Sequence, residues 1–416
     1  MTVTDLCRGA AAAARQLRLT PTEVKDRVLE QFAAAIDGQR ERLKAANALD
    51  VEAAREAGTS DTLIDRLTLT DKRISGMAGA IRTIVGLPDP VGAVTGGRTR
   101  PNGLLIEQVR EPLGVVAVVY EARPNVTADV AALCLKSGNA AVLRGSSIAR
   151  HSNAAIAAVI GRVLADQDEV PAEAVQLIAD TSHDSVLELL HARDFVDLVV
   201  PRGGPGLINL VRDNAKVPTV IDGDGNCHTY VDASADPAMA TSIVVNAKTS
   251  RPSVCNAMET LLVHRDLAET WLPGALDELS ALGVEIRGDE RTRQAWPKAV
   301  EALDADWSTE YLDLILAVRV VDGLDQALDH IDRYGTGNAD GIVAGDIAVA
   351  RRFARSVDSG SVFVNTSTRY SDGGEFGYGV EIGVSTQKLH ARGPMGLESL
   401  TCVKNVVWGE GQVRVL

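Results

Sequence analysis

The stretch Gly114-Val-Val-Ala-Val-Val119 is apolar on both sides of an extended chain. Such a run is typical of a strand in a parallel sheet that helices cover on both faces. Alanine-rich helical patterns at 153–165 and 185–190 alternate with further runs of this kind. The alternation predicts βαβ units in an open, doubly wound sheet. The other predicted strands of this sheet are 140–143, 175–178, 196–200 and 217–221.

Helices are expected before this sheet. Thr20-Pro-Thr-Glu23 has the pattern of a capping box with proline at the first helical position. A second helical stretch is predicted over 60–82. Behind the capping box, apolar residues recur at helical spacing, which indicates one buried face: Val28, Leu29, Phe32, Ala35 and Ile36.

A second α/β region is expected from 232 to 364, with strands at 260–263, 315–321 and 361–364. The glycine-rich stretch 371–383 is too long for a simple turn, and long ordered loops are often functional. Residues 104–109 and 401–413 are rich in strand-forming residues and predict extended segments.

Composition excludes several classes of protein. The 416 residues allow two or three domains of ~100–200 residues each. Lys and Arg number 42 against 56 Asp and Glu, and a formal charge of −14 lacks the basic surface of a general nucleic-acid binder. No apolar run approaches the ~20 residues of a membrane helix. The five scattered cysteines and 7 histidines have neither disulfide nor metal-site spacing. We therefore expect a cytoplasmic protein with reduced thiols, no metal and no membrane contact.

Two residues could carry chemistry. Cys255 follows Lys248 and Arg251, whose positive charge would favour a reactive thiolate. Spacing alone favours the alternative, a buried structural cysteine. Asn125 follows the Val-rich strand, and its amide could donate to a developing oxyanion. The alternative for Asn125 is a turn-forming residue behind Pro124.

Two loops that follow strands could bind a phosphate-bearing ligand. They are Leu143-Arg-Gly-Ser-Ser147 and Val200-Pro-Arg-Gly-Gly-Pro-Gly206. Glycine lets a ligand approach the backbone, and a helix N-terminus favours an anion. Ordinary turns explain either loop alone equally well, since neither contains a GxGxxG or Walker pattern.

Taken together, five segments resemble the γ-glutamyl phosphate reductase family, also called glutamate-5-semialdehyde dehydrogenase, of the aldehyde dehydrogenase superfamily. The most specific is Lys388-Leu-His-Ala-Arg-Gly-Pro-Met-Gly396, within 375–396; the others are 120–127, 201–206, 223–228 and 246–256. The resemblance implies an aldehyde-dehydrogenase-like α/β fold. Its expected parts are a Rossmann-like NADP(H)-binding domain (1–102 and 113–227), an α/β catalytic domain (228–400) and a small β-arm for oligomerisation (103–112 and 401–416).

The resemblance also implies an activity, the second step of L-proline biosynthesis. The family reduces L-glutamyl 5-phosphate with NADPH to L-glutamate 5-semialdehyde and phosphate. Cys255 would be the nucleophile, and the Asn125 amide and the Cys255 backbone N–H would hold the oxyanion. A homo-oligomer and functional coupling to glutamate 5-kinase are expected. Arg251 and Arg369 are candidates for binding the substrate, with surface ion pairing as their alternative. The expected cofactor-binding residues are Arg144, which would meet the 2′-phosphate, Gly145, Ser146, Ser147, Pro201, Arg202, Gly203, Gly204 and Glu310.

Two features bear on rival readings. Ile221-Asp-Gly-Asp-Gly-Asn226 lacks the glutamate with which oxidising aldehyde dehydrogenases activate water, which fits a reductase; Asp222 or Asp224 is the remaining candidate for that base. Asn338 stands where we expect the family's histidine. The rivals are an oxidising semialdehyde dehydrogenase and a non-catalytic nucleotide-binding regulator on the same fold.

Overall fold

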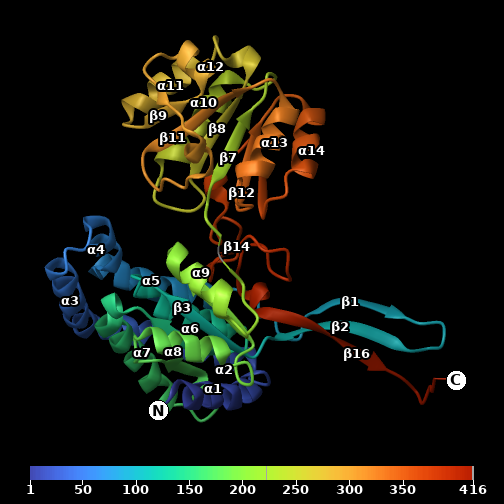
Figure 1. Cartoon of the computed structure of the whole chain (residues 1–416). Coiled ribbons are helices and arrows are strands. Elements are labelled where there is room, and N and C mark those ends of the chain that lie inside the picture. Colours follow the sequence, from blue (N-terminus) through green and yellow to red (C-terminus); the bar gives the residue numbers. More distant parts are fainter. Residues whose placement is uncertain (222, 415–416) are drawn as a thin grey trace. The chain divides into compact units, whose positions relative to one another are not determined.

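The computed structural model describes residues 1–221 and 223–414 (Figure 1). The chain divides into two compact units. Unit 1 comprises residues 1–222, 377–383 and 395–416, and unit 2 comprises 223–376 and 384–394. Residues 377–383 and 395–400, which we expected in the catalytic domain, thus belong to unit 1. Among the described residues, none of the helices combines the length and hydropathy that a membrane crossing needs.

Unit 1 contains a four-stranded parallel sheet in the order β5-β4-β3-β6. Every residue of β3 is buried, as expected of a strand covered on both faces. The segment 217–221 is not a strand of this sheet, because it contributes only an isolated bridge between Thr219 and Val199. The strands are β3 (Val115–Tyr120), β4 (Ala140–Gly145), β5 (Val175–Leu177) and β6 (Leu198–Arg202).

Helices precede and connect these strands. The helix expected after Thr20 begins at Thr22, and its N-cap Pro21 makes no side-chain cap bond, so the predicted capping box is wrong. Residues 60–82 form two helices rather than one. The helices of unit 1 are α1 (Val3–Leu17), α2 (Thr22–Gly38), α3 (Arg40–Glu56), α4 (Asp61–Leu67), α5 (Asp71–Val85), α6 (Asn125–Lys136), α7 (Arg150–Ala165), α8 (His183–His191) and α9 (Pro205–Asn214).

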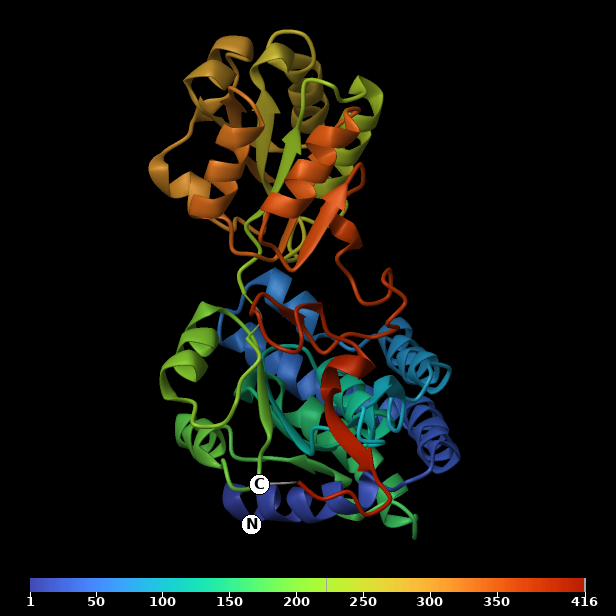
Figure 2. The ribbon, with the colours of Figure 1, turned by 90° about the vertical axis from the view of Figure 1, so that its right-hand side faces the viewer.

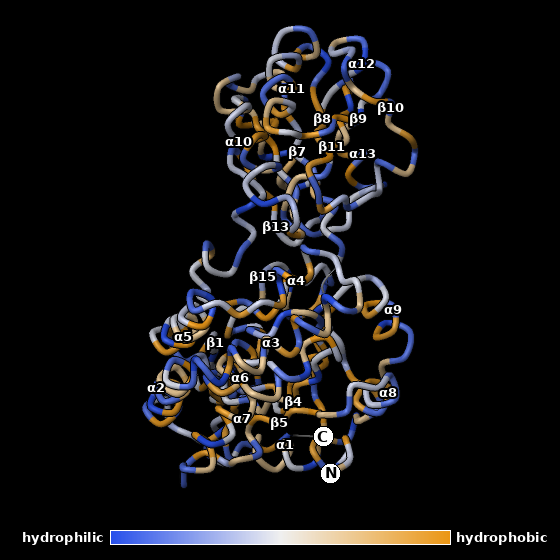
Figure 3. The backbone as a smooth tube through the Cα atoms, turned by 90° about the vertical axis from the view of Figure 1, so that its left-hand side faces the viewer, coloured by the Kyte–Doolittle hydropathy of each residue, from blue (hydrophilic) through white to orange (hydrophobic). Residues whose placement is uncertain are grey.

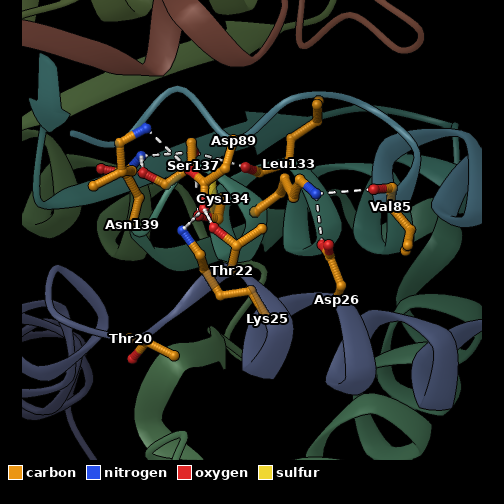
Figure 4. Close-up of polar contacts among 12 residues, drawn as sticks. Thr20, Thr22, Lys25, Asp26, Val85, Asp89, Leu133, Cys134, Ser137 and Asn139 are labelled. Carbon is orange, nitrogen blue, oxygen red and sulfur yellow. Dashed lines mark hydrogen bonds and ion pairs between the residues drawn. The ribbon is translucent and has the colours of Figure 1, made fainter. Parts of the chain in front are cut away.

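Two buried lysines join α2 to its neighbours (Figure 4). Lys25 is paired with Asp89, which also accepts a hydrogen bond from the Thr22 hydroxyl at 2.7 Å. Lys136 of α6 donates to Asp26 at 2.5 Å and to the carbonyl of Val85 at 2.9 Å. Because a buried charge without a partner is costly, these pairs are structural contacts.

An antiparallel three-stranded sheet completes unit 1, in the order β1-β2-β16. Its strands are β1 (Val94–Thr99), β2 (Leu105–Pro112) and β16 (Thr401–Trp408). Figure 1 shows them as an arm extending from the helices of this unit, and in Figure 2 the red β16 lies in front of those helices. β1 was not predicted, since Gly96 and Gly97 weaken its strand pattern.

Unit 2 is built on a seven-stranded parallel sheet in the order β10-β9-β11-β8-β7-β12-β13. Figure 3 shows orange, hydrophobic segments of chain near β8 and β11 of this sheet. The elements are β7 (Cys227–Val231), α10 (Pro237–Thr249), β8 (Met258–His264), α11 (Leu272–Ala281), β9 (Glu285–Gly288), α12 (Glu290–Ala295), β10 (Val300–Glu301), β11 (Ile315–Val321), α13 (Leu324–Tyr334), β12 (Ala339–Val343), α14 (Ile347–Ser356), β13 (Ser361–Val364), β14 (Val384–Ser385) and β15 (Gly393–Pro394).

Both faces of this sheet are buried. Leu261 and Val263 of β8 lie in a core cluster with α10 and α11, whereas the intervening Leu262 lies in a second cluster with α13 and α14. Side chains of a strand alternate between faces, so helices cover the sheet on both sides. The α/β fold expected from the sequence, with parallel sheets and connecting helices, is therefore confirmed.

Candidate active site

Cys255 lies in the turn between α10 and β8 and is partly exposed. Three other cysteines are buried, and burial raises the pKa of the Cys7 thiol to about 11 and that of Cys134 to about 12. Burial also raises the pKa of Cys227 well above its usual value. Because the thiolate is the nucleophile, these three thiols are poor candidates and Cys255 is the better one.

The segment before β7 packs directly against Cys255. A Cβ built on Gly225 would lie 1.8 Å from the Cys255 carbonyl oxygen, so only glycine fits there. The Cys227 thiol donates to the same oxygen at 3.2 Å. The Gly225 N–H donates to Glu310 Oε1 at 2.8 Å. Glu310 thus reaches the backbone beside the candidate nucleophile.

The positive charge expected from Lys248 is offset by a neighbour. Lys248 Nζ donates to Glu259 Oε2 at 2.6 Å, and both side chains are fully buried. Burial lowers the pKa of Lys248 and raises the pKa of Glu259 to about 7. This pair is a buried structural contact, so the expectation that Lys248 supplies a positive field at Cys255 is not supported.

Arg369 is the half-buried cation near Cys255. Burial and then the neighbouring Arg251 lower the pKa of Arg369, while Asp372, Cys255 and Cys227 raise it. The electrostatic influence of Arg251 and Cys255 on Arg369 means that the structure brings these three candidates into one region of unit 2. Arg251 itself is exposed.

The chain around Arg369 is bonded to the residue that follows Cys255. The Thr368 hydroxyl donates to the Asn256 carbonyl at 2.8 Å, and Asn256 Nδ2 donates to the Ser371 carbonyl at 3.0 Å. A cavity of about 520 Å³ opens here, within unit 2. Arg369 is among its lining residues.

In unit 1 the candidate cofactor residues meet at the carboxyl edge of the sheet. Tyr120, at the end of β3, is paired with Gly145 of β4 on one side and with Arg202 of β6 on the other. The strand order reverses at β3, and such switch points are where open α/β sheets bind ligands. Gly145, Ser146, Ser147, Pro201, Arg202, Gly203 and Gly204 all lie at this edge.

Two contacts at this edge limit what a ligand can bind. Arg144 is 8% exposed, and its Nη2 donates to the Ser182 carbonyl at 2.7 Å. Part of its guanidinium therefore binds the protein. The Gly204 N–H, at the start of α9, donates to Glu121 Oε2 at 3.0 Å. A phosphate bound at this helix start competes with that carboxylate.

Asn125 is the first residue of α6, and its Nδ2 donates to Asp129 Oδ2 at 2.8 Å. Burial raises the pKa of Asp129 to about 6, although the hydrogen bond from Asn125 and the charge of Arg202 each lower that pKa in part. Because a carboxylate only accepts hydrogen bonds, this bond orients the Asn125 side chain with its amide nitrogen, and not its oxygen, toward Asp129. Since the amide nitrogen carries two N–H groups, one stays available to a ligand.

The remaining sequence features have these positions. Asp224 is exposed, and Asp222 lies outside the described residues. Asn338 is buried, and neither polar atom of its side chain has a hydrogen-bond partner within residues 1–221 and 223–414. That part of the chain also holds no group of three His, Cys, Asp or Glu residues that could bind a metal ion.

Comparison with known proteins identifies the family. The model of the aldehyde dehydrogenase family matches residues 1–295. The γ-glutamyl phosphate reductase of Moorella thermoacetica is 54% identical over 405 residues, which are 97% of each chain. That of Thermobifida fusca is 53% identical over 412 residues, 99% of this chain and 98% of its own. The crystal structure of the Thermotoga maritima γ-glutamyl phosphate reductase aligns with this chain over 100% of both, with a TM-score of 0.97 and 46% sequence identity. The chain therefore belongs to the γ-glutamyl phosphate reductase family, within the aldehyde dehydrogenase superfamily of oxidoreductases.

Proposed function

We propose that the chain reduces L-glutamyl 5-phosphate with NADPH to L-glutamate 5-semialdehyde and phosphate, the second step of proline biosynthesis. The observation that carries the proposal is the setting of Cys255, a partly exposed cysteine whose backbone packs against Gly225 and Cys227 and which lies within electrostatic range of Arg369. It lies in a chain about half identical, over nearly its full length, to proteins named γ-glutamyl phosphate reductase. Because its cysteines are free, the reducing cytoplasm is the proposed compartment.

In this proposal Cys255 provides covalent catalysis. Its thiolate attacks the acyl carbonyl carbon of the substrate, and the Asn125 amide and the Cys255 backbone N–H donate to the oxyanion. Collapse breaks the carbon–oxygen bond to phosphate and leaves a thioester on Cys255. NADPH, when bound, supplies the hydride that reduces this thioester. Cys255 then leaves the resulting thiohemiacetal as a thiolate, and the aldehyde is released.

The assignment of the cofactor site is also a proposal. Gly203 and Gly204 fit a pyrophosphate, because their backbone is exposed at the N-terminus of a ten-residue helix. Ser146 and Ser147, after β4, are assigned to the adenosine ribose, and Arg144 to the 2′-phosphate. Glu310 is assigned to the nicotinamide ribose. To bind it, the Glu310 carboxylate would give up its hydrogen bond from the Gly225 N–H and accept one from a ribose hydroxyl instead.

Two further roles are proposed for parts of the chain. The arm is assigned to homo-oligomerisation, since β16 is an edge strand that exposes Val403, Val407 and Trp408. An acyl phosphate hydrolyses readily, so the kinase that makes it, glutamate 5-kinase, is the proposed functional partner.

The reaction is tested in reverse by nicotinamide absorbance, with L-glutamate 5-semialdehyde and NADP⁺, with and without phosphate. Turnover that requires phosphate supports the proposal, turnover without phosphate indicates an oxidising dehydrogenase, and no turnover indicates a non-catalytic protein. Cys255→Ala should abolish turnover and leave the affinity for NADPH unchanged. An active Cys255→Ala variant would exclude the thioester.

A further inference from the structure

We propose that the cavity in unit 2 recognises the α-amino acid end of the substrate, with Arg369 pairing with the α-carboxylate and Glu375 with the α-ammonium group. The inference rests on the proposed function, because it assigns residues that distinguish L-glutamyl 5-phosphate from acyl phosphates that lack these groups. Glu375 lies in the glycine-rich stretch 371–383, for which the sequence predicts a functional loop without indicating a role for this residue.

The cavity has the size and character of a site for a small polar ligand. Its volume of about 520 Å³ lies within the ~300–1,000 Å³ of ligand pockets. Most of the side chains that line it are polar, and they include one cation and one anion, Arg369 and Glu375.

Arg369 is held so that most of its guanidinium can bind a ligand. Its Nε donates to the Ser250 hydroxyl at 3.1 Å. Within residues 1–221 and 223–414 this is the only hydrogen bond that the guanidinium donates, and it forms no ion pair there. Both terminal nitrogens therefore remain for a carboxylate, which a guanidinium binds through two parallel hydrogen bonds.

Glu375 is presented by an ordered turn. The Gly374 N–H donates to Asp372 Oδ1 at 2.9 Å, and the Phe376 N–H donates to the Asp372 carbonyl, also at 2.9 Å. The Phe376 ring packs on Phe363, with 6.3 Å between ring centroids. The Glu375 carboxylate makes neither a hydrogen bond nor an ion pair with the part of the chain that the structure describes, so it can pair with an ammonium group.

The cavity is connected to the reacting sulfur. Arg369 lies within electrostatic range of Cys255, and Asn256, next to that cysteine, is bonded to the chain on both sides of Arg369. In the substrate, three carbon–carbon bonds of about 1.5 Å separate the reacting carbonyl from the α-carbon. Such a chain is short enough that groups beside Cys255, and not remote ones, must bind the α-substituents.

The charges on this cavity match those of an α-amino acid. An analogue without the α-amine leaves the Glu375 carboxylate unpaired, and one without the α-carboxylate leaves Arg369 unpaired. Sites built around such groups reject analogues that lack them. A hydrogen bond to a charged group contributes a factor of about 10 to 100. Because Glu375 is exposed and Arg369 is half-buried, we expect each pair to contribute about tenfold, the lower end of that range.

The test compares three aldehydes in the phosphate-dependent reverse reaction. They are L-glutamate 5-semialdehyde, 5-oxopentanoate (without the amine) and 4-aminobutanal (without the carboxylate). Glu375→Gln should lower kcat/KM at least tenfold for the two amines and less than twofold for 5-oxopentanoate. Arg369→Gln should lower kcat/KM for L-glutamate 5-semialdehyde and 5-oxopentanoate, which carry the carboxylate, at least tenfold more than for 4-aminobutanal, which lacks it. Glu269→Gln, an exposed carboxylate of unit 2, is the matched control and should change none of them. Equal losses on all three aldehydes, or no loss, would overturn the assignment.

A binding measurement separates this inference from the proposed reaction. Calorimetric titration with L-glutamate and with glutarate requires no turnover. Wild type should bind L-glutamate more tightly than glutarate, and Glu375→Gln should remove the difference. That result would support the cavity assignment even if the wild type failed to reduce NADP⁺. Turnover by the wild type without any preference for L-glutamate would instead overturn the cavity assignment and leave the reaction standing.

Discussion

Gly225→Ala tests whether the packing against Cys255 positions the nucleophile. The added Cβ would lie 1.8 Å from the Cys255 carbonyl oxygen and 2.5 Å from its Cα, whereas real contacts of a Cβ are essentially never below 3.0 Å. The two segments must therefore separate by at least 3.0 − 1.8 = 1.2 Å. A misplacement of about 1 Å in a reacting group costs about 10²-fold in rate, or roughly 2.7 kcal/mol of barrier. We expect kcat to fall by about that factor.

The assay is kcat in the reverse reaction, together with the rate at which iodoacetamide alkylates Cys255. NADPH affinity should fall much less than kcat, since the residues proposed for the adenosine and pyrophosphate belong to unit 1 and only Glu310, proposed for the nicotinamide ribose, is bonded to Gly225. Gly274→Ala is the matched control, because a Cβ there meets nothing within 4 Å and alanine favours the helix α11. It should retain full activity. A Gly225→Ala enzyme with kcat within twofold of wild type would refute the positioning argument.

Three further predictions concern charged groups. Burial raises the pKa of Asp129 to about 6, so the folded state binds the Asp129 proton more tightly than the unfolded state does. The free energy of unfolding therefore falls as pH rises from about 4 to about 6. In thermal melts, Asp129→Asn should raise Tm at pH 8 and leave it unchanged at pH 4. Lys248→Met leaves Glu259 buried without its partner and should cost about 3–5 kcal/mol in denaturant unfolding, most of which the double variant with Glu259→Leu recovers. Arg144→Ala should weaken NADPH by roughly 1.5–3 kcal/mol and NADH hardly at all in fluorescence titrations; equal losses would mean that Arg144 only holds the loop at Ser182.

The sequence predicted those elements whose pattern is local and continuous. β11 and β13 have the predicted bounds, and β3 and β8 differ by one or two residues, since each contains a continuous run of mostly apolar residues, as buried parallel strands do. The segment 217–221 is similarly rich in apolar residues, but it does not form a strand of the sheet. Pro218 has no N–H to donate to a neighbouring strand, and only Thr219 forms a bridge.

Contacts between distant residues could not be predicted in this way. The start of α2, for example, is held by a bond from the Thr22 hydroxyl to Asp89, which is 67 positions away. Likewise, the approach of Gly225 to Cys255 and the bond from its N–H to Glu310 depend on how the loops before β7, β8 and β11 meet. The resemblance to a family identified Cys255 and Glu310 as candidates, but the glycine that fits between them is evident only from the structure.

Asn125 differs, because its partner was within reach of sequence reasoning. Asn125 and Asp129 are four apart on a helix that begins after Pro124, and side chains at that spacing are neighbours. The carboxylate accepts one amide N–H and leaves the other, so it orients the proposed oxyanion donor without using it up. Asn125→Ala removes that donor and should lower kcat by ~10²–10³. Asp129→Asn keeps an acceptor oxygen at the same place and should therefore cost much less in kcat. If both variants lost activity equally, the charge of Asp129, and not the orientation of the amide, would be what the reaction needs.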